Sequence, residues 1–166
     1  MDNIILIGMP GAGKSTVGVV LAKKLGYAFL DSDLLMQERE KKLLHEIIEE
    51  KGLDVFKKLE NEVNTSILTE HTIIATGGSV IYGIEAMMHL KSLGSVFYLK
   101  LDYEELQNRL GNLTERGVAI HSEQTLKDLY EERTPLYEKY ADITIDCSKK
   151  TIREIVLELT DLLYYK

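Results

Sequence analysis

The sequence has little that would support a disulfide, a multi-cysteine zinc site or a membrane span. Its single cysteine among 166 residues is Cys147, and one thiol can form neither an internal disulfide nor a zinc site built from several cysteines. No apolar run approaches the roughly 20 residues that a transmembrane helix needs. The opening residues, MDNIILIGMPG, lack the basic leader and cleavage site of a signal peptide. We therefore expect a cytoplasmic protein that does not enter a membrane.

Positive charge is also scarce. The 20 Lys and Arg residues are outnumbered by 27 Asp and Glu residues, which gives a net charge of −7. Because the phosphate backbone of nucleic acids attracts basic surfaces, we expect no nucleic-acid partner. A small anion can still bind where a few basic residues converge on one pocket. The chain has no internal repeat or linker rich in Pro, Gly or Ser, and its length predicts one domain over residues 1–166.

Apolar runs alternate with helical patterns along the chain. Residues 3–7 (NIILI) predict a strand buried on both faces, and further strands are predicted at 28–30, 72–75, 95–99 and 142–145. Such alternation is typical of a parallel sheet covered by helices on both faces. We therefore predict an α/β fold with five parallel strands flanked by helices, in which ligands bind beyond the carboxyl ends of the strands.

The segment GMPGAGKS, residues 8–15, matches the phosphate-binding pattern G-x-x-x-x-G-K-[ST] between a predicted strand and a predicted helix. Its glycines let backbone N–H groups turn towards phosphate oxygens, and the helix N-terminus adds partial positive charge. Lys14 supplies a mobile charge for the β- and γ-phosphates, and the Ser15 hydroxyl can bind Mg²⁺. A nucleoside triphosphate is therefore the predicted ligand. The expected contacts are Gly11, Ala12, Gly13, Lys14, Ser15 and Thr16.

Two carboxylates, Asp31 and Asp33, lie at the end of the second predicted strand, in FLDSD. Alternation along an extended chain puts them on the same side. One could hold Mg²⁺ through water and the other could accept the proton of an attacking hydroxyl. The alternative is that the two aspartates form an N-cap pair for the following helix, a role that Ser32 or Asp33 could also fill. Beside a phosphate-binding loop we favour the functional interpretation, which predicts a kinase that phosphorylates a second small molecule.

Five motifs, in this order and spacing, resemble those of the shikimate kinase family: GMPGAGKSTVG, LDSD, GLDVFKKLE, ATGGSV and ERTPLYEKYAD. The resemblance covers nearly the whole chain. It implies a P-loop kinase fold of the nucleoside-monophosphate-kinase type with strand order 2-3-1-4-5, a substrate-binding helical segment at about 33–61 and a lid at about 111–122. It also implies transfer of the γ-phosphate of ATP to the 3-hydroxyl of shikimate, with Mg²⁺, in aromatic amino acid biosynthesis. We expect a monomer.

The resemblance also implies individual roles. On the nucleotide side, Asp31 matches a carboxylate near Mg²⁺, Arg109 an arginine that packs on adenine, and Arg116 a lid arginine that reaches the phosphates. On the acceptor side, Asp33 matches the base that binds the shikimate hydroxyls, and Arg133 the arginine that holds the carboxylate. Without the resemblance, these arginines could equally be surface groups paired with nearby glutamates, such as Glu131 and Glu132.

The implied site can be stated by function. Phe56 and Glu60 match the family's FRxxE frame, and Gly77 and Gly78 match two of three consecutive glycines that approach the substrate. The expected catalytic residues are Lys14, Asp33 and Arg116; the metal ligands are Ser15 and Asp31; the substrate-binding residues are Asp33, Phe56, Lys57, Gly77, Gly78, Ser79 and Arg133.

The chain departs from the family pattern on the acceptor and lid sides. Lys57 replaces an arginine, Ser79 replaces the third glycine, Leu53 replaces a glutamate, and RGVA at 116–119 replaces the lid motif. Lysine keeps the charge but loses the two-pronged grip on a carboxylate, which could weaken binding roughly tenfold. Two alternatives therefore stay open: a kinase of another small hydroxyl substrate, such as homoserine or a sugar acid, or a non-catalytic nucleotide-binding module.

Overall fold

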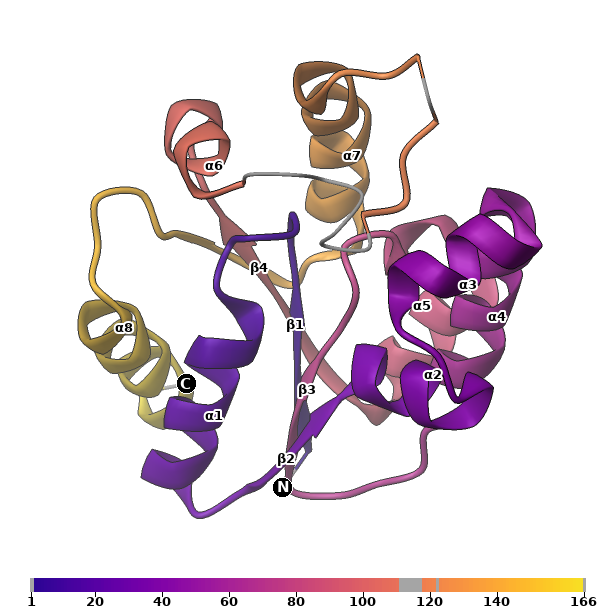
Figure 1. Ribbon diagram of the computed structural model, residues 1–166. Coiled ribbons are helices and arrows are strands. Elements are labelled where there is room, and N and C mark those ends of the chain that lie inside the picture. The colour runs from indigo at the N-terminus through magenta and orange to yellow at the C-terminus, as the bar shows by residue number, and fades with distance from the viewer. Residues whose placement is uncertain (1, 111–117, 122, 166) are drawn as a thin grey trace.

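A computed structural model describes residues 2–110, 118–121 and 123–165 of the chain (Figure 1). Five strands form one sheet in the order β2-β3-β1-β4-β5, and every neighbouring pair is parallel. The predicted α/β fold and strand order are therefore confirmed. The strands are β1 (Asn3–Ile7), β2 (Ala28–Asp31), β3 (Thr72–Ala75), β4 (Gly94–Lys100) and β5 (Ile143–Asp146).

Helices cover both faces of the sheet. Figure 1 shows α1 and α8 together on one side, and α5 with α2, α3 and α4 on the other. The elements are α1 (Lys14–Leu25), α2 (Ser32–Glu40), α3 (Leu44–Lys51), α4 (Leu53–Thr65), the 3-10 helix η1 (Val80–Tyr82), α5 (Ile84–Leu93), α6 (Tyr103–Arg109), α7 (Leu126–Tyr140) and α8 (Ile152–Tyr164). In the described part of the chain, no helix combines the length and apolar character that a bilayer crossing requires.

Local sequence explains where several helices begin. The side chain of Thr151 accepts a hydrogen bond from the backbone N–H of Glu154, whose carboxylate accepts one from the N–H of Thr151 in return. Thr125 and Asp128 form the same reciprocal cap at α7. Such boxes satisfy N–H groups that the first helical turn leaves without partners. These two caps therefore define where α7 and α8 begin.

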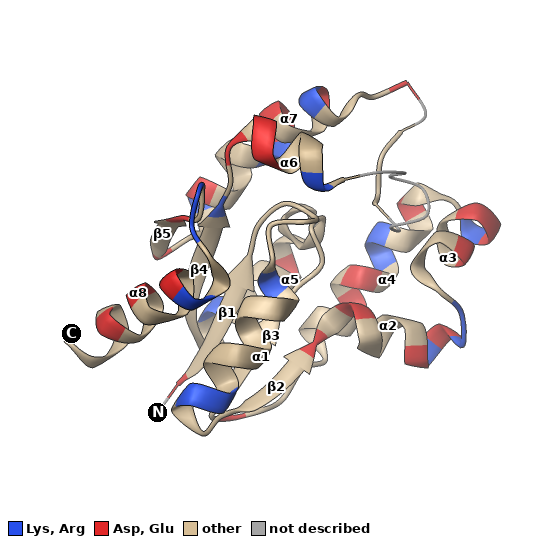
Figure 2. Cartoon of the chain, turned by 60° about the vertical axis from the view of Figure 1, so that its left-hand side comes forward, with Lys and Arg blue, Asp and Glu red and all other residues tan. Residues whose placement is uncertain are grey.

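The apolar core has two parts. The larger lies on both sides of the sheet, where β1 and β3 are buried along their whole length and carry no charged residue (Figure 2). The smaller lies among α2, α3 and α4 and contains Met36, Ile47, Phe56, Val63 and Ala119. Ala119 comes from far along the chain, so the smaller core ties the segment after α6 to the three helices that follow β2.

Candidate active site

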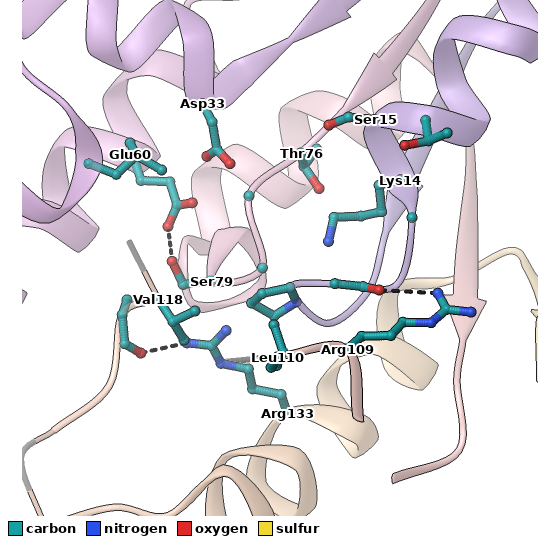
Figure 3. Close-up of a pocket in the computed structure, with 18 of the residues that line it drawn as sticks. Lys14, Ser15, Asp33, Glu60, Thr76, Ser79, Arg109, Leu110, Val118 and Arg133 are labelled. Carbon is teal, nitrogen blue, oxygen red and sulfur yellow. Dashed lines mark hydrogen bonds between the residues drawn. The ribbon is translucent and has the colours of Figure 1, made fainter. Parts of the chain in front are cut away.

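The carboxyl ends of β1, β2 and β3 open onto a cavity of about 650 Å³ (Figure 3). Most of the predicted site residues line it: Gly11, Gly13, Lys14, Ser15, Thr16, Asp33, Phe56, Gly77, Gly78, Ser79, Arg109 and Arg133. Ala12, Asp31 and Lys57 are not among the described lining residues. Arg116 and most of the predicted lid lie outside the described residues. The fold therefore brings the predicted nucleotide and acceptor groups to one cavity.

The phosphate-binding loop holds its lysine tightly. The ammonium of Lys14 donates to the carbonyl oxygens of Gly8, at 2.7 Å, and Met9, at 2.9 Å, and the residue is only 7% exposed. Its pKa is lowered to about 8, chiefly because burial disfavours the charged form, while the charge of Asp33 opposes that shift. Arg109 lies beside the same loop and donates to the carbonyl oxygen of Gly11 at 3.2 Å.

Asp31 connects the phosphate loop to the acceptor side. One of its carboxylate oxygens accepts the Ser15 hydroxyl at 2.7 Å, and the other accepts the backbone N–H of Asp33 at 2.9 Å. Asp31 is thus the N-cap of α2, so the capping alternative drawn from the sequence is confirmed for Asp31. Ser32 and Asp33 are the first and second residues of the helix and do not cap it.

The Ser15–Asp31 pair consists of the hard oxygen ligands that Mg²⁺ prefers. Among the described residues, no group of three or more His, Cys, Asp or Glu side chains could hold a metal ion. Mg²⁺ in kinases is usually held by one or two protein oxygens together with phosphate oxygens, so an all-protein cage is not required. The residues present therefore fit a magnesium ion that arrives with a nucleotide.

Gly77 separates two carboxyl groups. A Cβ atom placed on Gly77 would lie 2.4 Å from Oε2 of Glu60 and 2.6 Å from Oδ1 of Asp33, so a side chain there would have to displace these carboxyl groups. The pKa of Asp33 is raised to about 6, chiefly by burial and then by the charge of Asp31. The pKa of Glu60 is raised to about 7, again by burial first and then by Asp33. Bare backbone at Gly77 is what lets the two carboxyl groups face the cavity together.

Gly78 allows a second close approach. A Cβ atom there would lie 2.6 Å from Cδ of Pro10 and 3.0 Å from Nη1 of Arg133. The Tyr137 hydroxyl donates to the carbonyl oxygen of Gly78 and so fixes this stretch of backbone. The glycine pair thus borders the phosphate loop on one side and the buried arginine on the other.

Ser79, which stands at the position of the family's third glycine, is 5% exposed and donates its hydroxyl to Oε1 of Glu60. This hydrogen bond favours the ionised form of Glu60 and opposes part of the rise in its pKa. The sequence predicted Ser79 as a substrate-binding residue, and its side chain ends in a hydroxyl donor. In the structure that donor is directed to a protein carboxyl group.

Arg133 is completely buried, so the interpretation as a surface arginine is wrong. Its Nη2 donates to the carbonyl oxygen of Ala119 at 2.6 Å, and its Nε donates to the Tyr82 hydroxyl at 3.4 Å. No ion pair found within 4.0 Å among the described residues involves Arg133. A buried guanidinium without an acidic partner, at the wall of a cavity, favours an anionic ligand.

Lys57 has a different environment. Its ammonium lies 4.2 Å from the centre of the Tyr82 ring. Tyr82 was not predicted as a site residue, because no sequence motif marks it. Leu110, Val118 and Ala119 form an apolar wall of the cavity that was not predicted either, because no periodic pattern distinguishes these residues from core residues.

Comparison with known proteins agrees with the geometry of the cavity. The profile of the shikimate kinase family matches residues 10–164. The chain is 36% identical over 160 residues to a shikimate kinase of Sulfurihydrogenibium sp. (strain YO3AOP1), covering 96% of each chain. It is 37% identical over 161 residues to a shikimate kinase of Staphylococcus haemolyticus, covering 96% of this chain and 93% of the relative.

Solved structures give the same result. The shikimate kinase from Acinetobacter baumannii in complex with shikimate superposes with a TM-score of 0.84 at 30% identity, covering 99% of this chain and 94% of the other. The shikimate kinase from Aquifex aeolicus superposes with a TM-score of 0.83 at 34% identity, covering 98% and 96%. The resemblance inferred from the five motifs is therefore confirmed.

Proposed function

The chain belongs to the shikimate kinase family, and we propose that it transfers the γ-phosphate of ATP to the 3-hydroxyl of shikimate, which yields shikimate 3-phosphate and ADP. Shikimate carries a carboxylate at one end and hydroxyls at the other, and the cavity offers a matching arrangement. Arg133 and Asp33 stand at different walls of the cavity (Figure 3).

The observation that carries this proposal is the buried Arg133. Its Nη1 lies beside the cavity-lining Gly78, and its guanidinium has no acidic partner within 4.0 Å among the described residues. A planar guanidinium can bind both oxygens of a carboxylate at once. An acceptor that lacked a carboxylate would leave this buried charge uncompensated, so we infer that the acceptor is an acid.

Asp33 is proposed as the base. With a pKa of about 6 it is mostly ionised at neutral pH, so it can accept the proton of the attacking hydroxyl. The hydroxyl oxygen then bonds to the γ-phosphorus while the bond from that phosphorus to the oxygen bridging to the β-phosphate breaks, and ADP leaves. Lys14 is proposed to stabilise the negative charge that develops on the phosphate oxygens.

Ser15 and Asp31 are proposed to hold Mg²⁺, whose charge, when the ion is bound, offsets that of the β- and γ-phosphates. The 2.7 Å hydrogen bond between them already brings a hydroxyl and a carboxylate oxygen to one place beside the loop. Arg109 and Arg116 keep the nucleotide-binding roles that the family resemblance implies.

The test is a coupled assay of ADP release with ATP, Mg²⁺ and shikimate. We expect turnover that depends on shikimate and saturates with it. ATP binding is measured separately by calorimetry, so that a folded, nucleotide-binding protein is shown in the same preparation. ADP release that does not rise above the background with ATP alone would refute the shikimate assignment, and a screen of other hydroxy acids would follow.

A further inference from the structure

Tyr82 lies where three helical elements meet, and it has no role in the proposed phosphate transfer. It ends η1, which contacts both α4 and α7. These two helices carry Lys57 and Arg133, the cations that the sequence assigned to the acceptor. Tyr82 is partly buried and does not belong to the described residues that line the cavity. Its contacts therefore act on the cavity through other side chains.

The hydroxyl of Tyr82 forms two hydrogen bonds. It accepts from Nε of Arg133 at 3.4 Å and donates to Oε1 of Glu132 at 2.9 Å. The second carboxylate oxygen of Glu132 accepts from the side chain of Gln124 at 2.7 Å, so Glu132 is itself fixed. Together with the bond from Arg133 to Ala119, these contacts leave the guanidinium little freedom to rotate.

The ring of Tyr82 contacts both cations. The ammonium of Lys57 lies 4.2 Å and Cζ of Arg133 lies 5.4 Å from its centre. Both distances are within the range of cation–π attraction. Two like charges so close would otherwise repel, and the pKa of Lys57 is indeed lowered by burial and by Arg133. The ring and the carboxylate of Glu132 offset that repulsion.

We propose that Tyr82 is a positioning residue of the acceptor site, which keeps Arg133 facing the cavity and keeps Lys57 behind it. Lys57 then acts on the acceptor carboxylate through Tyr82 and Arg133 rather than by direct contact. This inference rests on the proposed function, because it concerns how the same carboxylate is bound. It also explains how lysine can stand where the family has arginine: the residue here packs on a ring instead of gripping a carboxylate.

The first experiment replaces Tyr82 and measures KM for shikimate, KM for ATP and kcat. For Tyr82→Leu, which removes ring and hydroxyl, we expect KM for shikimate to rise roughly tenfold. For Tyr82→Phe, which keeps the ring, we expect a rise of about threefold. KM for ATP should not change in either variant, whereas general damage to the fold would alter it. Unchanged KM for shikimate in both variants would overturn the proposal.

Tyr140→Leu is the matched control. Tyr140 lies on α7, the helix of Arg133, and like Tyr82 it packs against a cation, with the Lys139 ammonium 5.4 Å from its ring centre, and it is not among the described residues that line the cavity. We expect this variant to keep the wild-type KM for shikimate. A rise equal to that of Tyr82→Leu would show that the effect is not specific to the acceptor site and would overturn the proposal.

A double-mutant cycle separates indirect from direct action of Lys57. In the wild-type background, Lys57→Met should raise KM for shikimate about threefold, as expected for loss of one cation–π contact. In the Tyr82→Leu background, the same change should have no further effect. An equal factor in both backgrounds would mean that Lys57 binds the acceptor directly. Absence of shikimate turnover by the wild-type enzyme would instead refute the proposed function, so the two failures are distinguishable.

Discussion

The phosphate side and the acceptor side of the cavity are formed by different parts of the polypeptide. The phosphate side consists largely of backbone, with glycines at positive φ and a lysine held by the loop's own carbonyl oxygens. The acceptor side consists of ionisable side chains from α2, α4 and α7, and those of Glu60 and Arg133 are held by partners distant in sequence. A backbone site tolerates few changes, whereas a side-chain site can exchange one partner for another. All the described departures from the family motifs lie on the acceptor side or next to it.

The largest expected effect separates the two sides by function. Asp33→Asn removes the base while ATP still meets an intact phosphate loop. We expect kcat to fall by about 10² to 10⁴, the usual contribution of a general base, with ATP affinity unchanged by calorimetry. Asp54→Asn, which changes an exposed residue in the first turn of α4, serves as the control. Retention of wild-type kcat by the Asp33 variant would contradict its role.

The next prediction concerns the stability cost of the acceptor side. The pKa of Glu60 is raised from 4.5 to about 7 in the folded protein, so its favourable contribution is complete below the pKa of the unfolded chain and is lost as pH rises through about 7. Glu60→Gln removes the ionisable group. At pH 8 we expect its free energy of unfolding to exceed that of the wild type by up to about 3 kcal/mol.

Urea unfolding at pH 4 and pH 8 tests this prediction. The difference between wild type and Glu60→Gln should appear at pH 8 and vanish at pH 4. Glu62→Gln, on the exposed face of the same helix in an ion pair with Arg39, should change stability by no more than about 1 kcal/mol. A Glu60→Gln variant less stable than wild type at pH 8 would show that the ionised carboxylate stabilises the fold.

A smaller effect should distinguish acceptor binding from nucleotide binding. Arg133→Met removes the buried guanidinium, and we expect KM for shikimate to rise roughly 10- to 100-fold, the effect of losing a hydrogen bond to a charged group. KM for ATP should stay within about twofold of the wild type, since the hydrogen bonds of the guanidinium go to Tyr82 and Ala119 and not to the phosphate loop. The control is Arg39→Met, an exposed arginine outside the cavity. Equal increases in both KM values would contradict the division of the cavity.

The smallest expected effect concerns pH. Burial and Asp31 raise the pKa of Asp33 to about 6, so this carboxylate is protonated and cannot accept a proton below that value. We expect kcat/KM for shikimate to fall about tenfold for each pH unit below 6. The Glu60→Gln variant should keep this acid limb, which would assign the limb to Asp33. A limb centred near pH 4 would show that the raised pKa is absent from the free enzyme.

Much of the fold and the phosphate side could be predicted from the sequence, because their signals are local. The apolar run at residues 3–7 predicted a buried strand, and residues 8–15 predicted a phosphate loop between a strand and a helix; the structure has both elements in these places. Five parallel strands followed from the alternation of elements, while their order came only from the family resemblance. That order is confirmed.

The acceptor side could be predicted only in part, because its contacts depend on tertiary geometry. Arg133 was named through the family motif, but nothing in the sequence showed that its partners are Tyr82 and the carbonyl oxygen of Ala119. The direction of the Ser79 hydroxyl depends on Glu60, which lies nineteen residues earlier on α4. The environment of Lys57 could not be predicted either, since the position of a residue on a helix does not reveal the aromatic ring on which its side chain packs.

The glycine pair after β3 has a consequence for how this sequence can diverge. Any replacement at Gly77 adds at least a Cβ atom, which would meet Glu60 and Asp33 at 2.4 and 2.6 Å and would displace these carboxyl groups of the acceptor side. Two residues later, the hydroxyl of Ser79 is accommodated because Glu60 accepts it. A side chain at position 77 therefore disturbs the two carboxyl groups, whereas position 79 accommodates one, and we expect substitutions to be tolerated better at position 79 than at position 77.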